Sequence, residues 1–113
     1  MELDRNLVTG SMAMLVMKLL EDGDKYGYQM IEELRQKSGD AFRLKAGTLY
    51  PLLHGLEAKG YVTACEKSAE NGKTRRYYHL TEAGGRALKD KTAAWETYTE
   101  AVGRVLKGGV CFG

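Results

Sequence analysis

Seven residues in two parts of the chain have side chains suited to binding a polyanion. Lysine and arginine neutralise phosphates, lysine also bonds to guanine acceptors, and threonine bonds to bases or packs on a thymine methyl group. The first group lies at the front of a leucine-rich segment, Gly47 to Gly60, and the second follows Gly72. The set is Lys45, Thr48, Tyr50, His54, Lys73, Arg75 and Arg76. We predict that these residues contact nucleic acid, with an ordinary core helix and solvated loops as the alternatives.

The sequence gives no support for catalysis or metal binding. It has no glycine-rich phosphate loop, no paired carboxylates in a pocket-like context and no recognisable Cys/His or Ser/His motif. His54 and His79 stand alone, and Cys65 and Cys111 match no zinc-ligand spacing. We therefore predict no enzymatic activity, no metal and no cofactor, and two reduced thiols in preference to a disulfide. Oxidant sensing by these cysteines remains an alternative.

The composition is that of a single soluble domain. The chain has 113 residues, of which 43% are hydrophobic and 28% charged, with a net charge of +2. This net charge is too small to indicate a polyanion partner, so the local clusters carry that argument. The apolar run from Leu7 to Leu20 follows acidic residues and is too short to span a bilayer. We predict a cytoplasmic protein without membrane contact.

Two helices are expected in the first third of the chain. The first begins with Thr9 or Ser11 as its cap, because apolar residues then recur at helical spacing. Asp22-Gly23-Asp24 is predicted to end it and to cap a second helix over residues 25–37. Gly27 within that helix implies that another helix approaches closely, since glycine otherwise weakens a helix.

The leucine-rich segment is predicted to be the third helix. From Leu49 to Leu56 the leucines recur at i, i+3, i+4 and i+7, which makes one apolar face. Pro51 lies close to the helix start, where few N–H groups have partners to lose. Gly60 stops the helix, because glycine adopts the left-handed conformation that a helix end needs.

Past this helix the hydrophobic period changes from 3.6 to 2. Residues 61–65 and 75–80 are rich in β-branched and aromatic side chains, which predicts two strands of a hairpin with a polar tip between them. Alternate residues of a strand point to opposite faces. Tyr78 should therefore face the core, whereas Tyr77 and His79 face the other side.

A long last helix is predicted from Thr81, its cap, to about Lys107. Its apolar seam has no obvious room on a small three-helix core. We predict that the seam is buried against a second copy of the chain, with Trp95 and Tyr98 as anchors, because large aromatic residues dominate interface energetics. The alternative is a helix that packs wholly within its own domain.

Helix, helix, helix, strand, wing, strand and final helix is the layout of a winged helix-turn-helix, and several segments match a known family. They are Tyr26-Gly27-Tyr28, Leu49-Tyr50-Pro51-Leu52-Leu53, Leu56-Glu57, Lys59-Gly60, residues 72–78, and Leu80-Thr81 with Gly84. In this order they closely resemble the PadR family of bacterial transcriptional regulators, in its short subgroup with a single C-terminal helix.

The resemblance implies an α+β fold, mostly α, and a homodimeric repressor of transcription. A dimer of this kind should bind an inverted repeat in double-stranded DNA. The expected division is a DNA-binding domain over residues 1–80, a dimerisation helix over 81–107 and a short tail over 108–113. A winged-helix module that binds protein without DNA is the alternative.

Some small members of that family hold flat aromatic compounds between paired tryptophans at the dimer centre. Trp95 has the corresponding place on the last helix, and two such rings across a twofold axis can enclose a planar apolar molecule. The predicted ligand and dimer interface is Trp95, Tyr98, Met12, Leu15 and Val102. The alternative is an interface core without a pocket. Operator, regulated genes and inducer are left open.

Overall fold

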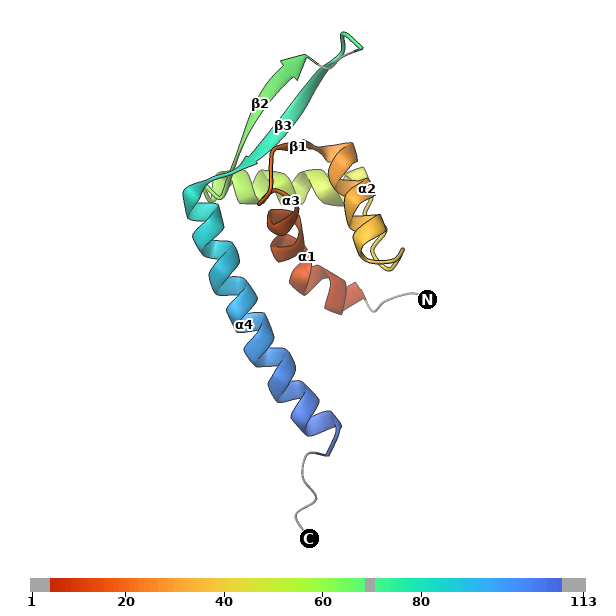
Figure 1. Cartoon of the computed structure of the whole chain (residues 1–113), viewed down its shortest axis with the longest axis vertical. Coiled ribbons are helices and arrows are strands. Elements are labelled where there is room, and N and C mark those ends of the chain that lie inside the picture. The colour runs from red at the N-terminus through yellow and green to blue at the C-terminus, as the bar shows by residue number, and fades with distance from the viewer. Residues whose placement is uncertain (1–4, 69–70, 109–113) are drawn as a thin grey trace.

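The computed structural model describes residues 5–68 and 71–108 of the chain. Four helices and three strands follow one another in the order α1, β1, α2, α3, β2, β3, α4 (Figure 1). Their bounds are Arg5–Leu19 for α1, Lys25–Tyr26 for β1, Gly27–Lys37 for α2, Ala46–Ala58 for α3, Val62–Ser68 for β2, Thr74–Leu80 for β3 and Glu82–Leu106 for α4.

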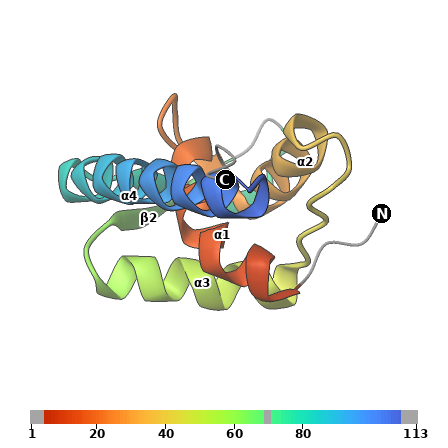
Figure 2. The ribbon, with the colours of Figure 1, turned by 90° about the horizontal axis from the view of Figure 1, so that it is seen from below.

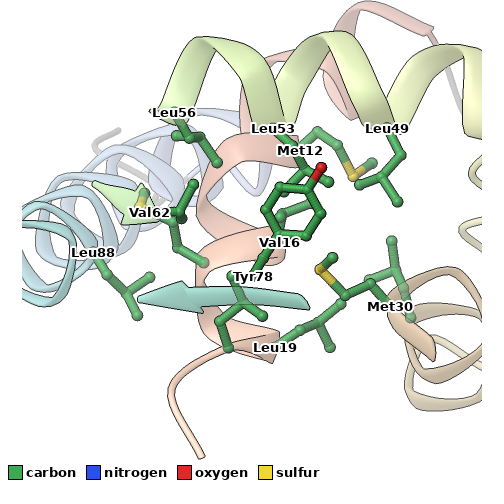
Figure 3. Close-up of a cluster of buried hydrophobic side chains, with 13 residues drawn as sticks. Met12, Val16, Leu19, Met30, Leu49, Leu53, Leu56, Val62, Tyr78 and Leu88 are labelled. Carbon is green, nitrogen blue, oxygen red and sulfur yellow. The ribbon is translucent and has the colours of Figure 1, made fainter. Parts of the chain in front are cut away.

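The core lies where α1, α2, α3 and the inner face of the sheet meet (Figure 3). Leu49, Leu53 and Leu56 of α3 are buried, which confirms the apolar face predicted from their spacing, while Leu52 is only partly buried. They pack in one cluster with residues of α1 such as Val16. In Figure 2, α1 lies between α3 and α4. The opposite side of α3 is left to solvent.

Two helix starts differ from the prediction. Helix α1 begins at Arg5, so Thr9 and Ser11 lie within the helix and neither caps it. Asp24 does not cap α2, because Tyr26 is the N-cap residue and its N–H donates to the Gln29 side chain at 3.0 Å. The chain between these helices enters the sheet instead of starting a helix at residue 25.

Lys25 and Tyr26 form β1, a strand that the sequence did not indicate. They pair with Tyr78 and Tyr77 of β3, and the sheet has the antiparallel order β1-β3-β2. The predicted hairpin is confirmed, with strands that are longer at the tip. Tyr78 is only 1% exposed and His79 is exposed, so the predicted faces of β3 are correct.

The two ends of α3 have different chemistry. Pro51 is its sixth residue, farther from the start than predicted, so the helix lacks the N–H that would donate to the Gly47 carbonyl. At the other end Gly60 has a φ of 78°, Gly60 N–H donates to Glu57 and Tyr61 N–H donates to Leu56. This is a Schellman ending, and it confirms Gly60 as the stop.

Helix α4 lies against α1 in its first part, as far as about Tyr98. The Thr81 hydroxyl accepts a bond from Gly84 N–H at 2.9 Å, which confirms Thr81 as the cap, and Leu88 is buried. The rest of the helix projects beyond the body (Figure 1). The radius of gyration is 16.7 Å, against about 13 Å for a compact chain of this length. Much of the apolar face of α4 therefore lies outside the protomer core.

Candidate nucleic-acid interface

The exposed front of α3 carries the first group of predicted residues. Lys45, Thr48 and His54 are all exposed, because the leucines of this helix take the face that packs on the core. Within the described residues, these three side chains form no hydrogen bond or ion pair. They are therefore available to a molecule that approaches this side of the helix.

The N-terminus of α3 is electrostatically suited to an anion. Lys45 is the N-cap residue, its side chain makes no capping bond, and the first turn contains no acidic residue. The unpaired N–H groups and the positive end of the helix dipole lie here, next to a cation. Such an arrangement is unfavourable in isolation and becomes favourable when a phosphate or another anion binds.

Tyr50 is held between this surface and α2. Its side chain is 39% exposed, and its ring end lies against Gly27 so closely that a Cβ there would be 2.4 Å from the Tyr50 hydroxyl oxygen. This contact explains the glycine at the start of α2 and confirms that another helix approaches it. The position of the Tyr50 ring is thus set by helix packing.

The cations of the wing do not form one free cluster. Lys73 lies at the tip, and its side chain has no partner within the described part of the chain. The Arg75 guanidinium lies over the Tyr26 ring, 4.3 Å from its centroid. The Arg76 guanidinium donates to the carboxylate of Glu57 at 3.4 Å. The prediction from the sequence grouped these three side chains because all are cations, but their surroundings in the structure differ.

Asp24 joins the outer face of the sheet to the turn after α1, a contact that was not predicted. Its carboxylate bonds to His79 Nδ1 at 2.8 Å and lies 3.6 Å from the Lys67 ammonium. The hydrogen bond from His79 is the main cause that lowers the pKa of Asp24 below its ordinary value of 3.8. No local pattern signals this contact, because Asp24 and His79 are 55 residues apart.

The apolar stripe of α4 is the second exposed surface. Trp95 is 39% exposed, Tyr98 63% and Leu106 79%, and the Trp95 and Tyr98 ring centroids are 6.4 Å apart. A hollow of about 270 Å³ lies beside them, lined by Ala13, Met14, Lys91, Ala94, Trp95 and Tyr98. A larger hollow of about 480 Å³ lies nearer the start of α4, where Lys18, Glu21, Lys89 and Glu96 make it too charged for an apolar ring.

The other residues predicted for this interface lie deeper. Met12 is 4% exposed and belongs to the protomer core, so it offers little surface to a partner or ligand. Leu15 and Val102 are partly buried. Met14, which the prediction omitted, lines the hollow beside Trp95. Because α1 is apolar on more than one side, sequence spacing alone did not separate its core residues from those facing α4.

We also searched the part of the chain that the structure describes for a metal site, a membrane-spanning helix and a disulfide. Within residues 5–68 and 71–108 no three His, Cys, Asp or Glu side chains are grouped as metal ligands would be. In the same ranges, no helix has both the length and the apolar character needed to cross a membrane. Cys65 is exposed as a free thiol, and Cys111 lies outside the described residues.

Comparison with known proteins places these surfaces in context. A family model described as the transcriptional regulator PadR-like family matches residues 16–90. The curated transcriptional regulator Rv3488 of Mycobacterium tuberculosis is 39% identical over 83 residues, which cover 73% of this chain and 74% of that protein.

Solved structures agree in fold. A transcriptional regulator from Clostridium thermocellum is similar with a TM-score of 0.81 and 29% identity, over 88% of this chain and 96% of that one. A PadR family transcriptional regulator from Eggerthella lenta is similar with a TM-score of 0.79 and 32% identity, over 89% of this chain and 86% of that one.

Proposed function

Because this chain belongs to the PadR-like family of transcriptional regulators, we propose that it is a homodimeric repressor that binds an inverted repeat in double-stranded DNA. The family is one of regulators and not of enzymes. The observation that carries the proposal is the front of α3, which is exposed, cationic and without partners within the described residues. Such a regulator acts where the chromosome lies, so we place it in the cytoplasm.

We assign base contacts to α3 and backbone contacts to the wing. Lys45, Thr48 and His54 lie on the part of α3 that enters a major groove in helix-turn-helix proteins, with Tyr50 at its edge. We assign a phosphate contact to Lys73, because its side chain is exposed at the tip of the hairpin. On this view residues 1–80 bind DNA and residues 81–107 join two copies.

Dimerisation follows from the exposed stripe of α4. Soluble monomers rarely leave several large apolar residues together in water, and such a stripe marks an interaction site. A second α4 against Trp95 and Tyr98 covers it in a twofold arrangement, in which each copy presents the same surface. Two α3 helices then face the same side of one duplex, which requires half-sites one helical turn apart or a multiple of it.

Release of the repressor is assigned to a planar aromatic ligand at this interface. Trp95 and Tyr98 lie beside a hollow lined mostly by small and apolar side chains. A partner copy that brings its own Trp95 across the twofold axis would supply the second wall for a flat ring.

DNA binding is tested by selecting bound sequences from a random duplex pool. We expect an inverted repeat, and a binding constant that falls with salt by a log–log slope of about 0.9 for each phosphate neutralised. Thr48→Ala should relax specificity at one or two base pairs, with each lost base contact worth about 1–3 kcal/mol. A pool without enrichment, or binding that ignores salt, would contradict the proposal.

The ligand is tested by Trp fluorescence of the dimer titrated with a panel of planar aromatic compounds. We expect saturable quenching by some of them and loss of DNA affinity at the same concentrations. Trp95 is the only tryptophan of the chain, so the signal reports this site, and Tyr98→Ala should weaken the quenching. If no compound of a broad panel quenches Trp95, the ligand assignment is wrong.

A further inference from the structure

Arg75 and Arg76 are neighbours in the sequence but lie on opposite faces of β3. Arg75 is on the outer face, over the Tyr26 ring. Arg76 is on the inner face, where its guanidinium carbon lies 5.8 Å from the centroid of the Tyr78 ring and its Nη2 donates to Glu57. Among the described residues, Glu57–Arg76 is the one ion pair that joins α3 to the sheet.

The hairpin is held on its outer face by the chain between α1 and α2: β3 pairs with β1, the Arg75 guanidinium lies over the Tyr26 ring and the Lys67 ammonium lies 3.6 Å from Asp24. On the inner face, the Glu57–Arg76 ion pair links it to α3. Val62 and Tyr78 near its base are buried, but from Cys65 to Ser68 every residue of β2 is exposed. Arg76 pairs with Glu66, four residues beyond the pair formed by Val62 and Leu80. At about 3.3 Å per residue, this is roughly 13 Å above the base. The hairpin therefore leaves the core below the level of Arg76, as its projection in Figure 1 illustrates.

The base of the hairpin and Arg76 are both attached to the same end of α3. The Schellman turn at Gly60 joins α3 directly to β2, and Glu57 is the last residue but one of the helix. The contacts with β1 and Asp24 hold the outer face of the hairpin to the chain between α1 and α2, whereas the Glu57–Arg76 ion pair holds its inner face to α3 itself. The Tyr78 ring beside Arg76 limits the guanidinium further.

We propose that Glu57 and Arg76 are positioning residues that set the angle of the wing relative to α3. The inference rests on the proposed function, since the angle matters when α3 and the wing tip must reach one duplex together. Arg76 then acts through the orientation of Lys73 and not as a phosphate contact of its own. Arg76→Ala would lower affinity on a specific operator because the wing is displaced.

The decisive variant is Glu57→Gln, because its effect on DNA affinity has one sign if Glu57 only repels DNA and the opposite sign if Glu57 positions the wing. Removing a negative charge close to DNA should tighten binding if only electrostatics matter. Loss of the ion pair should instead weaken binding to the selected operator by about two- to fivefold, the size expected for an ion pair whose side chains are 48% and 35% exposed. Glu66→Gln is the matched control, since Glu66 lies opposite Arg76 on the exposed wing and forms no ion pair with it.

The experiment measures binding of the full-length protein to a fluorescent duplex of the selected operator at several salt concentrations. We expect Glu57→Gln and Arg76→Gln to weaken binding alike, and the double variant to be no weaker than either one. The salt slope should stay unchanged in Arg76→Gln and fall by about one in Lys73→Gln. Thermal melting of each variant checks that the fold is retained.

Three results separate the possibilities. If Glu57→Gln tightens binding as Glu66→Gln does, or if Arg76→Gln lowers the salt slope as much as Lys73→Gln, then Arg76 is a phosphate contact and the positioning role is wrong. If the wild-type chain selects no DNA sequence, the proposed function fails first. If wild type binds and the double variant is additive, only the positioning role fails.

Discussion

Gly84 is the residue with the least free space around it among the described glycines. A Cβ there would lie 2.0 Å from the backbone oxygen of Tyr61 and 2.7 Å from Leu80 Cδ1. Side chains can rotate away from such a clash, but the oxygen of Tyr61 belongs to the turn that joins α3 to β2. Gly84 thus lets the first turn of α4 touch the backbone of the wing.

We expect Gly84→Ala to lower the free energy of unfolding by about 1–3 kcal/mol, the usual cost of overpacking. Gly85→Ala is the matched control, because a Cβ at Gly85 meets nothing within 4 Å. Its effect should be neutral or a gain of up to about 1 kcal/mol from better helix propensity. Denaturant unfolding of both variants measures the difference, and equal effects would show that the contact with Tyr61 is unimportant.

At the residue scale, the three predicted wing cations also differ in their surroundings. Three wing cations were predicted to act together, yet Arg75 is stacked on an aromatic ring, Arg76 is paired with a carboxylate and Lys73 alone has no partner among the described residues. A cation that is already satisfied within the protein gains less from a phosphate than a free one. We therefore expect the number of phosphate contacts to be smaller than the number of basic residues.

At the scale of elements, Thr81 joins α4 to α3. Its hydroxyl accepts from Gly84 N–H at 2.9 Å and donates to the Gly60 carbonyl at 2.7 Å. One side chain therefore caps the start of α4 and satisfies a carbonyl at the end of α3. The angle between α4, the proposed dimerisation helix, and the proposed recognition helix depends in part on this contact.

We expect Thr81→Ala to lower the free energy of unfolding by about 1–2 kcal/mol, since both bonds of the hydroxyl are lost. Thr81→Ser keeps the oxygen and should cost well under half as much. Thermal melting followed by circular dichroism compares the two. If serine is as harmful as alanine, then the threonine methyl group and not the hydroxyl is the important part.

At the scale of the whole molecule, the protomer is longer than its core requires. Helix α4 extends the molecule to 68 Å in its longest dimension, and large apolar side chains near its end are exposed. Exposed apolar area of this kind is stabilised when a second copy covers it. The proposed dimer therefore accounts for the length of α4 as well as for its composition.

We expect sedimentation to show a dimer at micromolar concentration. Tyr98→Asp should weaken it by at least 2 kcal/mol, because a charge then replaces a central aromatic contact. Thr97→Asp adds the same charge at the neighbouring position of α4, about 100° around the helix, and should leave the dimer intact. A monomeric wild type, or equal effects of the two variants, would contradict the dimer interface.

What the sequence determined by itself is the order of the four helices and the hairpin, together with the faces of α3 and β3. The spacing of the leucines in α3, the alternation of Tyr77 and Tyr78, and the cap at Thr81 were all confirmed. These features depend on backbone geometry and on residues within about one helical turn of each other, so the local pattern contains the information. The winged helix-turn-helix fold followed from their order.

Only the tertiary structure decided which side chains are free and which are paired. The pairing of β1 with β3, the contact of Asp24 with His79 and the ion pair of Glu57 with Arg76 join residues 19 to 55 positions apart. Whether two such side chains meet depends on how helices and sheet pack, and that is set by the whole core. The division between contact residues and positioning residues could not come from the sequence for this physical reason.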